Sequence, residues 1–104
     1  MPIPKLDDSA IDAALATLPG WRREGGALTK EYDCKTFPAA AALLLRALLL
    51  AERQDHHPEI DMRYSKVIFR VSTHDAGGIS ARDVRFAKAL DDAGAEAHAE
   101  ARAP

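Results

Sequence analysis

The sequence predicts an α+β fold in which three helices pack on one face of a four-stranded antiparallel sheet. Three segments carry apolar residues at helical spacing, and four shorter segments alternate apolar with polar residues. Their order along the chain is α-β-β-α-β-β-α, and helices placed between pairs of adjacent strands favour an antiparallel sheet over a parallel one. A chain of 104 residues is the size of one domain.

The first predicted helix lies near the start of the chain. Apolar residues recur at helical spacing from Ile11 to Leu18, and Ser9 with Asp12 resembles a capping box. Pro19 then ends the run. We therefore expect a short helix that begins at Ser9.

A β-hairpin is predicted next. Residues 21–24 and 27–32 flank Gly25 and Gly26, a pair that tolerates the positive φ of a tight turn. Alternation places Leu28 and Tyr32 on the same face of the second strand.

The second predicted helix is rich in alanine and leucine. Thr36 can cap it, Pro38 falls in its first turn, and strong helix formers continue to about Asp55. Pro58 prevents a longer helix.

Two more strands and a third helix follow. Residues 60–64 and 67–73 alternate apolar and polar side chains, which is the period of a strand. Ser80 can cap the third helix. Its apolar face consists of Val84, Phe86, Ala87 and Leu90.

The end of the chain is predicted to differ from the rest. Residues 94–104 are small or charged and contain no large apolar side chain, so that folding this segment buries little surface. We expect a single domain over residues 1–93 and a flexible, alanine-rich tail over residues 94–104, which is either a frayed helix or disordered.

Composition excludes several classes of protein. The 14 Lys and Arg against 16 Asp and Glu give a net charge of -2, so that no overall field attracts nucleic acid as a direct partner. The most apolar stretch, residues 37–51, is too short to span a membrane and contains Arg46. Cys34 is the single cysteine, and the first residues lack the pattern of a secretory signal, so that we expect a cytoplasmic protein.

Three of the four histidines lie in the part of the sequence that is most informative about chemistry. His56 and His57 fall at the end of the second helix, and His74 falls at the end of the last strand. These positions adjoin loops, where functional groups are commonly displayed on a rigid scaffold. Imidazole donates and accepts protons near neutral pH, which suits an elimination reaction.

A metal site is the rival interpretation of such a cluster. Adjacent histidines lack the i, i+4 spacing that places two imidazoles on one helix face, and no cysteine pair accompanies them. We therefore expect neither a metal nor a cofactor.

The whole pattern of this region is more specific than its histidines alone. An acidic residue is followed after three residues by His-His-Pro, then by an aromatic residue, a third histidine and an aspartate. These positions are filled by Glu52, His56, His57, Pro58, Tyr64, His74 and Asp83. With this pattern the chain resembles the pterin-4a-carbinolamine dehydratases, which are also described as dimerisation cofactors of a homeodomain transcription factor.

The resemblance implies a site and a reaction. His56, His57 and His74 would surround a pterin, supported by Glu52 and Asp83. The enzyme would convert 4a-hydroxytetrahydropterin to quinonoid dihydropterin during tetrahydrobiopterin recycling, next to an aromatic amino-acid hydroxylase as a pathway partner. We expect His56 and His74 to donate protons and His57 to position the substrate.

The resemblance also implies residues that bind the substrate. Pro58 would contact it, and the backbone amides of Ser72, Thr73 and His74 would hold the amide edge of the pterin.

Some alternatives stay open at this stage. Asp83 lies three residues after Ser80 and can be the acid of a capping box, and Glu52 can be a solvated residue of the last helical turn. Cys34 lacks a nearby base and is interpreted as a small apolar residue. In place of pterin recycling, the chain could be a protein-interaction module for a transcription factor, or could handle a pterin of molybdopterin metabolism.

The second helix also predicts self-association. Residues 39–51 are apolar all round the helix apart from Arg46, so that no choice of inward face buries every leucine. We expect a homodimer or homotetramer assembled partly through this helix.

Overall fold

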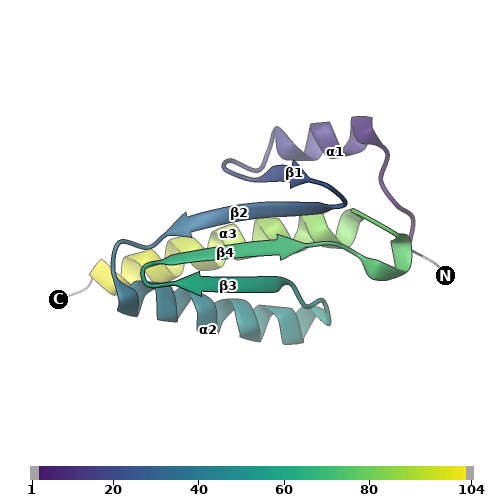
Figure 1. Cartoon of the computed structure of the whole chain (residues 1–104). Coiled ribbons are helices and arrows are strands. Elements are labelled where there is room, and N and C mark those ends of the chain that lie inside the picture. Colours follow the sequence, from purple (N-terminus) through teal and green to yellow (C-terminus); the bar gives the residue numbers. More distant parts are fainter. Residues whose placement is uncertain (1–2, 103–104) are drawn as a thin grey trace.

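The computed structural model describes residues 3–102, with the side chains of residues 3–95. Three α-helices, four strands and one short 3₁₀ helix follow one another along the chain (Figure 1). They are α1 (Asp8–Leu15), β1 (Arg22–Glu24), β2 (Ala27–Asp33), α2 (Phe37–Gln54), β3 (Glu59–Arg63), β4 (Lys66–Val71), η1 (His74–Ala76) and α3 (Ala81–Arg102).

The four strands form one antiparallel sheet in the order β1-β2-β4-β3. Leu28 of β2 lies opposite Val71 of β4, and Ile60 of β3 lies opposite Phe69. The predicted α+β class, the antiparallel sheet and the element order are confirmed.

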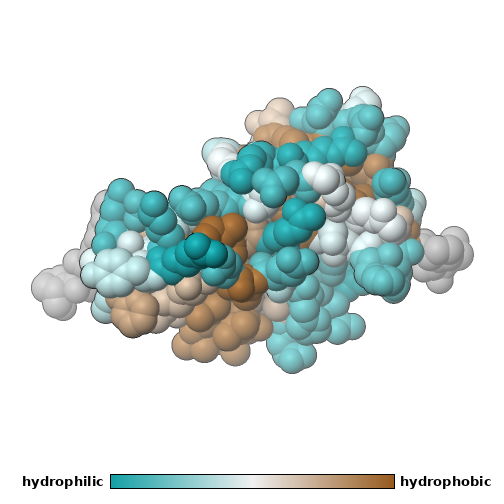
Figure 2. Space-filling view, viewed as in Figure 1, coloured by the Kyte–Doolittle hydropathy of each residue, from teal (hydrophilic) through white to brown (hydrophobic). Residues whose placement is uncertain are grey.

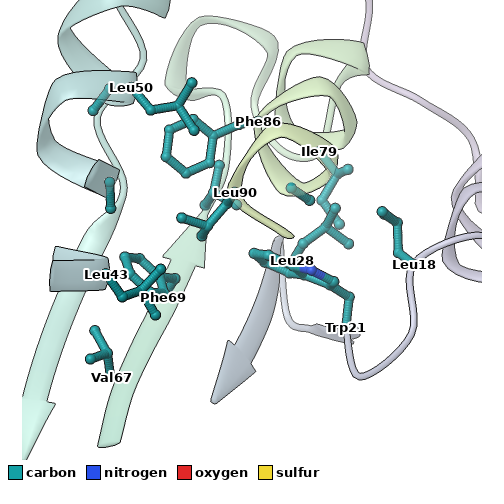
Figure 3. Close-up of a cluster of buried hydrophobic side chains, with 14 of the residues drawn as sticks. Leu18, Trp21, Leu28, Leu43, Leu50, Val67, Phe69, Ile79, Phe86 and Leu90 are labelled. Carbon is teal, nitrogen blue, oxygen red and sulfur yellow. The ribbon is translucent and has the colours of Figure 1, made fainter. Parts of the chain in front are cut away.

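One face of the sheet carries the core. Every second residue of β4, beginning at Val67, is buried against the helices, whereas Lys66 and Arg70 point to the other face. All three helices contribute side chains to this core, among them Ile11, Leu43 and Phe86. Figure 3 shows Leu43 of α2 beside Phe69 of the sheet, and Leu50 of α2 beside Phe86 of α3, within one core cluster.

The cap of α1 differs from the sequence prediction. Asp7 is the N-cap, and its carboxylate accepts a hydrogen bond of 2.8 Å from the backbone N–H of Ala10. The predicted capping box of Ser9 and Asp12 was therefore wrong. Aspartate caps a helix as well as serine does, so that local sequence did not distinguish the two starts.

The cap of α2 agrees with the prediction. Thr36 Oγ1 accepts from the N–H of Ala39 at 3.2 Å, and Pro38 lies in the first turn. No helix within residues 3–102 is long and apolar enough to cross a membrane.

The hairpin of β3 and β4 is shorter than predicted. Tyr64 is not part of β3, because it lies in the turn with a φ of 57°, in the left-handed region. At the other end β4 stops at Val71, and Thr73 pairs only with Gly78 in an isolated bridge.

Helix α3 continues to Arg102, beyond the predicted domain boundary at residue 93. The flexibility expected of residues 94–104 stays a prediction, and residues 103 and 104 lie outside the described part of the chain.

Candidate functional site

The β3–β4 hairpin brings the histidine segments together. Glu59 pairs with Arg70, so that β3 begins where β4 ends. If this register is continued past the strands, the residues before Glu59 face the residues after Arg70. The structure connects His56 with Thr73 through Asp83, which is hydrogen-bonded to both side chains.

His56 is the histidine that the fold holds most tightly. A hydrogen bond of 2.6 Å joins its Nε2 atom to Oδ1 of Asp83, in the first turn of α3. The side chains of His56 and Asp83 are 9% and 0% exposed, so that water screens this contact little. The ring of His56 also packs edge-on against Phe86, with 6.2 Å between the ring centroids. Its orientation is thus fixed on two sides.

The second oxygen of Asp83 belongs to a separate set of contacts. Oδ2 accepts from the backbone N–H of Ser80 at 2.8 Å and from the hydroxyl of Thr73 at 2.9 Å. The hydroxyls of Thr73 and Ser80 lie 2.6 Å apart, and Ser80 Oγ accepts from the N–H of Arg82. Both carboxylate oxygens are hydrogen-bonded, as a fully buried charge requires.

Asp83 therefore makes contacts of both kinds that the sequence left open, while its part in the chemistry stays a prediction. It is the capping-box acid of α3, through its bond to Ser80, and it binds the buried histidine of the site, His56.

The remaining predicted residues lie around this buried pair. His57 and His74 are exposed, each next in the chain to a buried residue of the network, His56 and Thr73 respectively. Their rings can reach a bound molecule without first leaving the core.

The other predicted site residues are Pro58, which is partly buried, and Ser72, which is exposed. Glu52 is exposed on the last turn of α2, where its carboxylate faces water. Because Glu52 is exposed, its position agrees with a solvated residue of the helix and also with a residue that supports the histidines.

Tyr64 is not brought to the site. It lies in the turn at the opposite end of β3 from His57, is 76% exposed, and stacks on Phe37 with 6.0 Å between the ring centroids. The predicted strand over residues 60–64 could have indicated this separation, because an extended strand places His57 and Tyr64 at opposite ends. His98, the fourth histidine of the sequence, lies outside the residues whose side chains are described.

A cavity of about 480 Å³ lies away from the histidines, between β2, α2 and α3. Oδ1 of Asp91 accepts there from Lys30 Nζ at 2.9 Å, from Trp21 Nε1 at 3.0 Å and from the hydroxyl of Tyr32. Burial, together with the bond to Asp91, raises the pKa of Tyr32 well above its ordinary value. These side chains tie β2 to α3 and leave the histidine site untouched.

The described part of the chain contains no cluster of side chains suited to bind a metal ion. Among its side chains, no group of three or more His, Cys, Asp or Glu is placed to hold an ion. The absence of a metal from the working protein stays a prediction.

The fold and the site together define a small α+β protein in which a buried histidine, His56, is held by a buried carboxylate, and two further histidines, His57 and His74, are exposed. A profile of the family described as pterin 4 alpha carbinolamine dehydratase matches residues 4–93. The chain belongs to this family.

Individual relatives agree with the family assignment. A protein of Nocardia farcinica, named as a pterin-4-alpha-carbinolamine dehydratase, is 44% identical over 87 residues, which are 84% of this chain and 92% of the relative. A protein of the same name from Thermomicrobium roseum is 44% identical over 86 residues, 83% of this chain and 92% of the relative.

A crystal structure is similar over the same region. It is described as a transcriptional coactivator/pterin dehydratase from Brucella melitensis, and it superposes with a TM-score of 0.83 at 30% identity, covering 86% of this chain and 98% of that one.

Proposed function

We propose that the protein dehydrates 4a-hydroxytetrahydropterin to quinonoid dihydropterin by histidine acid–base catalysis, in the recycling of tetrahydrobiopterin. Membership of the dehydratase family supports the reaction class. The hydrogen bond between buried His56 and buried Asp83, flanked by His57 and His74, is the observation that supports histidine catalysis.

The reaction needs two proton movements. The C4a hydroxyl is a poor leaving group until it is protonated, after which it departs as water. N5 must lose its proton so that the C4a=N5 double bond can form. The net change is the loss of one water molecule, and no electron acceptor is required.

The geometry suggests how His56 takes part. With Asp83 ionised, the ring carries a proton on Nε2, which donates to Oδ1, and leaves Nδ1 as the nitrogen that exchanges protons. His74 is the exposed partner that acts as the second proton-transfer group. His57, also exposed, orients the pterin, and the backbone amides of Ser72 and His74 bind its amide edge. The N–H of Thr73 already donates to the carbonyl oxygen of Gly78 at 2.9 Å.

The direct test is the rate of carbinolamine breakdown. The carbinolamine is generated by an aromatic amino-acid hydroxylase, and its decay is followed by ultraviolet absorbance in stopped flow, with and without this protein. We expect catalytic amounts of the protein to accelerate the decay. A decay rate that does not change when the protein is added would refute the proposed reaction for the pterin tested.

A second proposed property concerns α2. Phe37, Leu45, Leu48 and Leu49 are each more than half exposed and form one outer stripe of the helix. Figure 2 shows hydrophobic surface where α2 lies in Figure 1. We propose that this stripe is covered by α2 of another subunit in a homodimer or homotetramer. Burial of its apolar surface contributes roughly 25 cal/mol per Å² before the entropic costs of association.

The same stripe favours an interaction module as the alternative function, and the Brucella melitensis structure carries the description of a coactivator. Variants at His56 separate the two functions. An adaptor would bind its partner without the acid–base set, whereas the dehydratase would not work without it.

A further inference from the structure

A second contact joins the same two helices beside the His56–Asp83 pair. Arg82, the residue before Asp83 in the first turn of α3, donates from Nη2 to the carbonyl oxygen of Asp55 at 2.6 Å and to that of Gln54 at 3.3 Å. The last carbonyls of a helix have no partner within it, and Gln54 is the last residue of α2. Two adjacent residues of α3 therefore hold the last residue of α2 and the two residues that follow it.

The backbone that Arg82 holds has an unfavourable conformation. Asp55 has φ 49° and ψ 47°, in the left-handed region that glycine usually occupies at a helix end. Its N–H bonds back to the carbonyls of Ala51 and Glu52, and the N–H of His56 bonds to Ala51 at 3.0 Å. This turn sets the direction in which the backbone of His56 and His57 leaves the helix.

The charge of Arg82 also matches its place. The C-terminal end of a helix carries partial negative charge, which a cation stabilises. A guanidinium has several N–H donors in one rigid plane, so that it loses little freedom when it binds two carbonyls at once.

We propose that Arg82 is a positioning residue of the histidine site, an inference that rests on the proposed function. Arg82 fixes the turn at Asp55, and Asp83 fixes the ring of His56. Together they hold the segment of His56 and His57 against the start of α3.

The experiment combines Arg82 with the strained turn. Arg82→Ala is expected to lower kcat/KM for dehydration by about 10- to 100-fold, the range expected for a small misplacement of catalytic groups. Arg82→Lys should recover part of this loss. Asp55→Gly adopts the left-handed turn without a side-chain penalty, so that Arg82→Ala in the Asp55→Gly background should lose only a few-fold.

The matched control is Arg85→Ala. Arg85 lies on the next turn of α3 and is exposed, and its loss removes the same charge from the same helix. Thermal unfolding of every variant gives the temperature range in which all of them are folded, and rates are compared within it. We expect Arg85→Ala to keep the wild-type kcat/KM.

A readout independent of turnover is the imidazole ¹⁵N and ¹H NMR spectrum of His56 and His57. Arg82→Ala is expected to shift these signals and to speed exchange of the Nε2 proton that His56 donates to Asp83, while Arg85→Ala leaves them unchanged. If the wild-type protein does not accelerate dehydration, the proposed function fails, and the NMR comparison alone decides the role of Arg82.

Two results would overturn the proposal. One is an Arg82→Ala protein whose histidine signals and kcat/KM match those of the wild type. The other is a loss of kcat/KM from Arg82→Ala that is equally large in the wild-type background and in the Asp55→Gly background. In that case Arg82 would not act through the turn at Asp55. If Arg82→Ala does not fold, Arg82→Lys and the double variant with Asp55→Gly supply the same comparison.

Discussion

Asp83 shows how much one side chain determines at this site. Its Oδ1 atom binds His56, and its Oδ2 atom binds both the N–H of Ser80 and the hydroxyl of Thr73. The carboxylate thereby connects the start of α3, the end of β4 and the end of α2. A change of one atom at this position should alter chemistry and stability to different extents.

The variant Asp83→Asn tests whether the protonation state of the His56 ring depends on the carboxylate. The amide oxygen can still accept from Ser80 and Thr73, but the amide nitrogen donates to His56 and so requires an unprotonated Nε2, which reverses the tautomer. We expect a folded protein that is destabilised by about 1–3 kcal/mol, with turnover lowered by about 100-fold or more.

Denaturant unfolding and stopped-flow turnover measure the two effects, and exposed Asp92→Asn of α3 is the control. Wild-type turnover in Asp83→Asn would exclude a role for the His56 tautomer.

The histidines are predicted to act as a unit. His56→Ala and His74→Ala should each slow dehydration by about 100-fold or less, and the double variant should be far slower than either. Single-turnover kinetics of the three proteins decide the matter. Near wild-type turnover in the double variant would rule out the acid–base assignment.

Cys34 is expected to be a poor nucleophile. Burial, followed by the charge of Asp33, raises the pKa of its thiol above the ordinary value. A raised pKa leaves less thiolate at a given pH, so that iodoacetamide should alkylate the folded protein at pH 8 more slowly than the unfolded protein. Equal rates, followed by mass spectrometry, would contradict this.

At the scale of elements, α2 has two apolar faces, one buried in the core and one exposed. Ala40, Leu43 and Ala47 are buried against the sheet and α3, whereas Leu45, Leu48 and Leu49 point outward. The prediction that no inward face can bury every leucine is confirmed. The outer face is the one that association would cover.

Leu48→Glu places a charge in the centre of this outer stripe. We expect it to shift the protein to monomers in sedimentation velocity at micromolar concentration, because an unpaired carboxylate in an apolar interface is costly to desolvate. Ala13→Glu makes the same change in charge on the exposed side of α1 and should leave the mass unchanged. A wild-type protein that is monomeric at high concentration would reject the interface.

At the scale of the whole molecule, the histidine segments and the turn at Tyr64 lie at opposite ends of the β3–β4 hairpin. His57 and the residues after Val71 share an end of the β3–β4 hairpin, while Tyr64 occupies the opposite turn. The core between the two ends is continuous across all three helices. If the proposed site at the histidine end binds substrate, the outer stripe of α2 stays available for the proposed second subunit.

Catalysis is expected to be independent of metal ions. The histidines lack metal-ligand spacing, and acid–base chemistry on the pterin needs no Lewis acid. Dialysis against a strong chelator should leave dehydration unchanged. Loss of activity that zinc restores would favour a metal site instead.

The sequence by itself determined the elements and their order. Helical and alternating periodicities are local, so they were readable from Ile11 to Leu90 without knowledge of the packing. The caps were only partly readable: Thr36 caps α2 as predicted, while Asp7 replaced Ser9 at α1 because both residue types suit that position. The motif around His56 also selected the family correctly.

Only the tertiary structure decided how the site residues are divided. His56 and His57 are adjacent and chemically identical, yet one is buried on Asp83 and the other is exposed. That difference depends on how α2 packs against α3, which joins residues 27 positions apart and leaves no local pattern. The contact of Arg82 with the turn at Asp55 is hidden for the same reason, because backbone carbonyls carry no sequence signal.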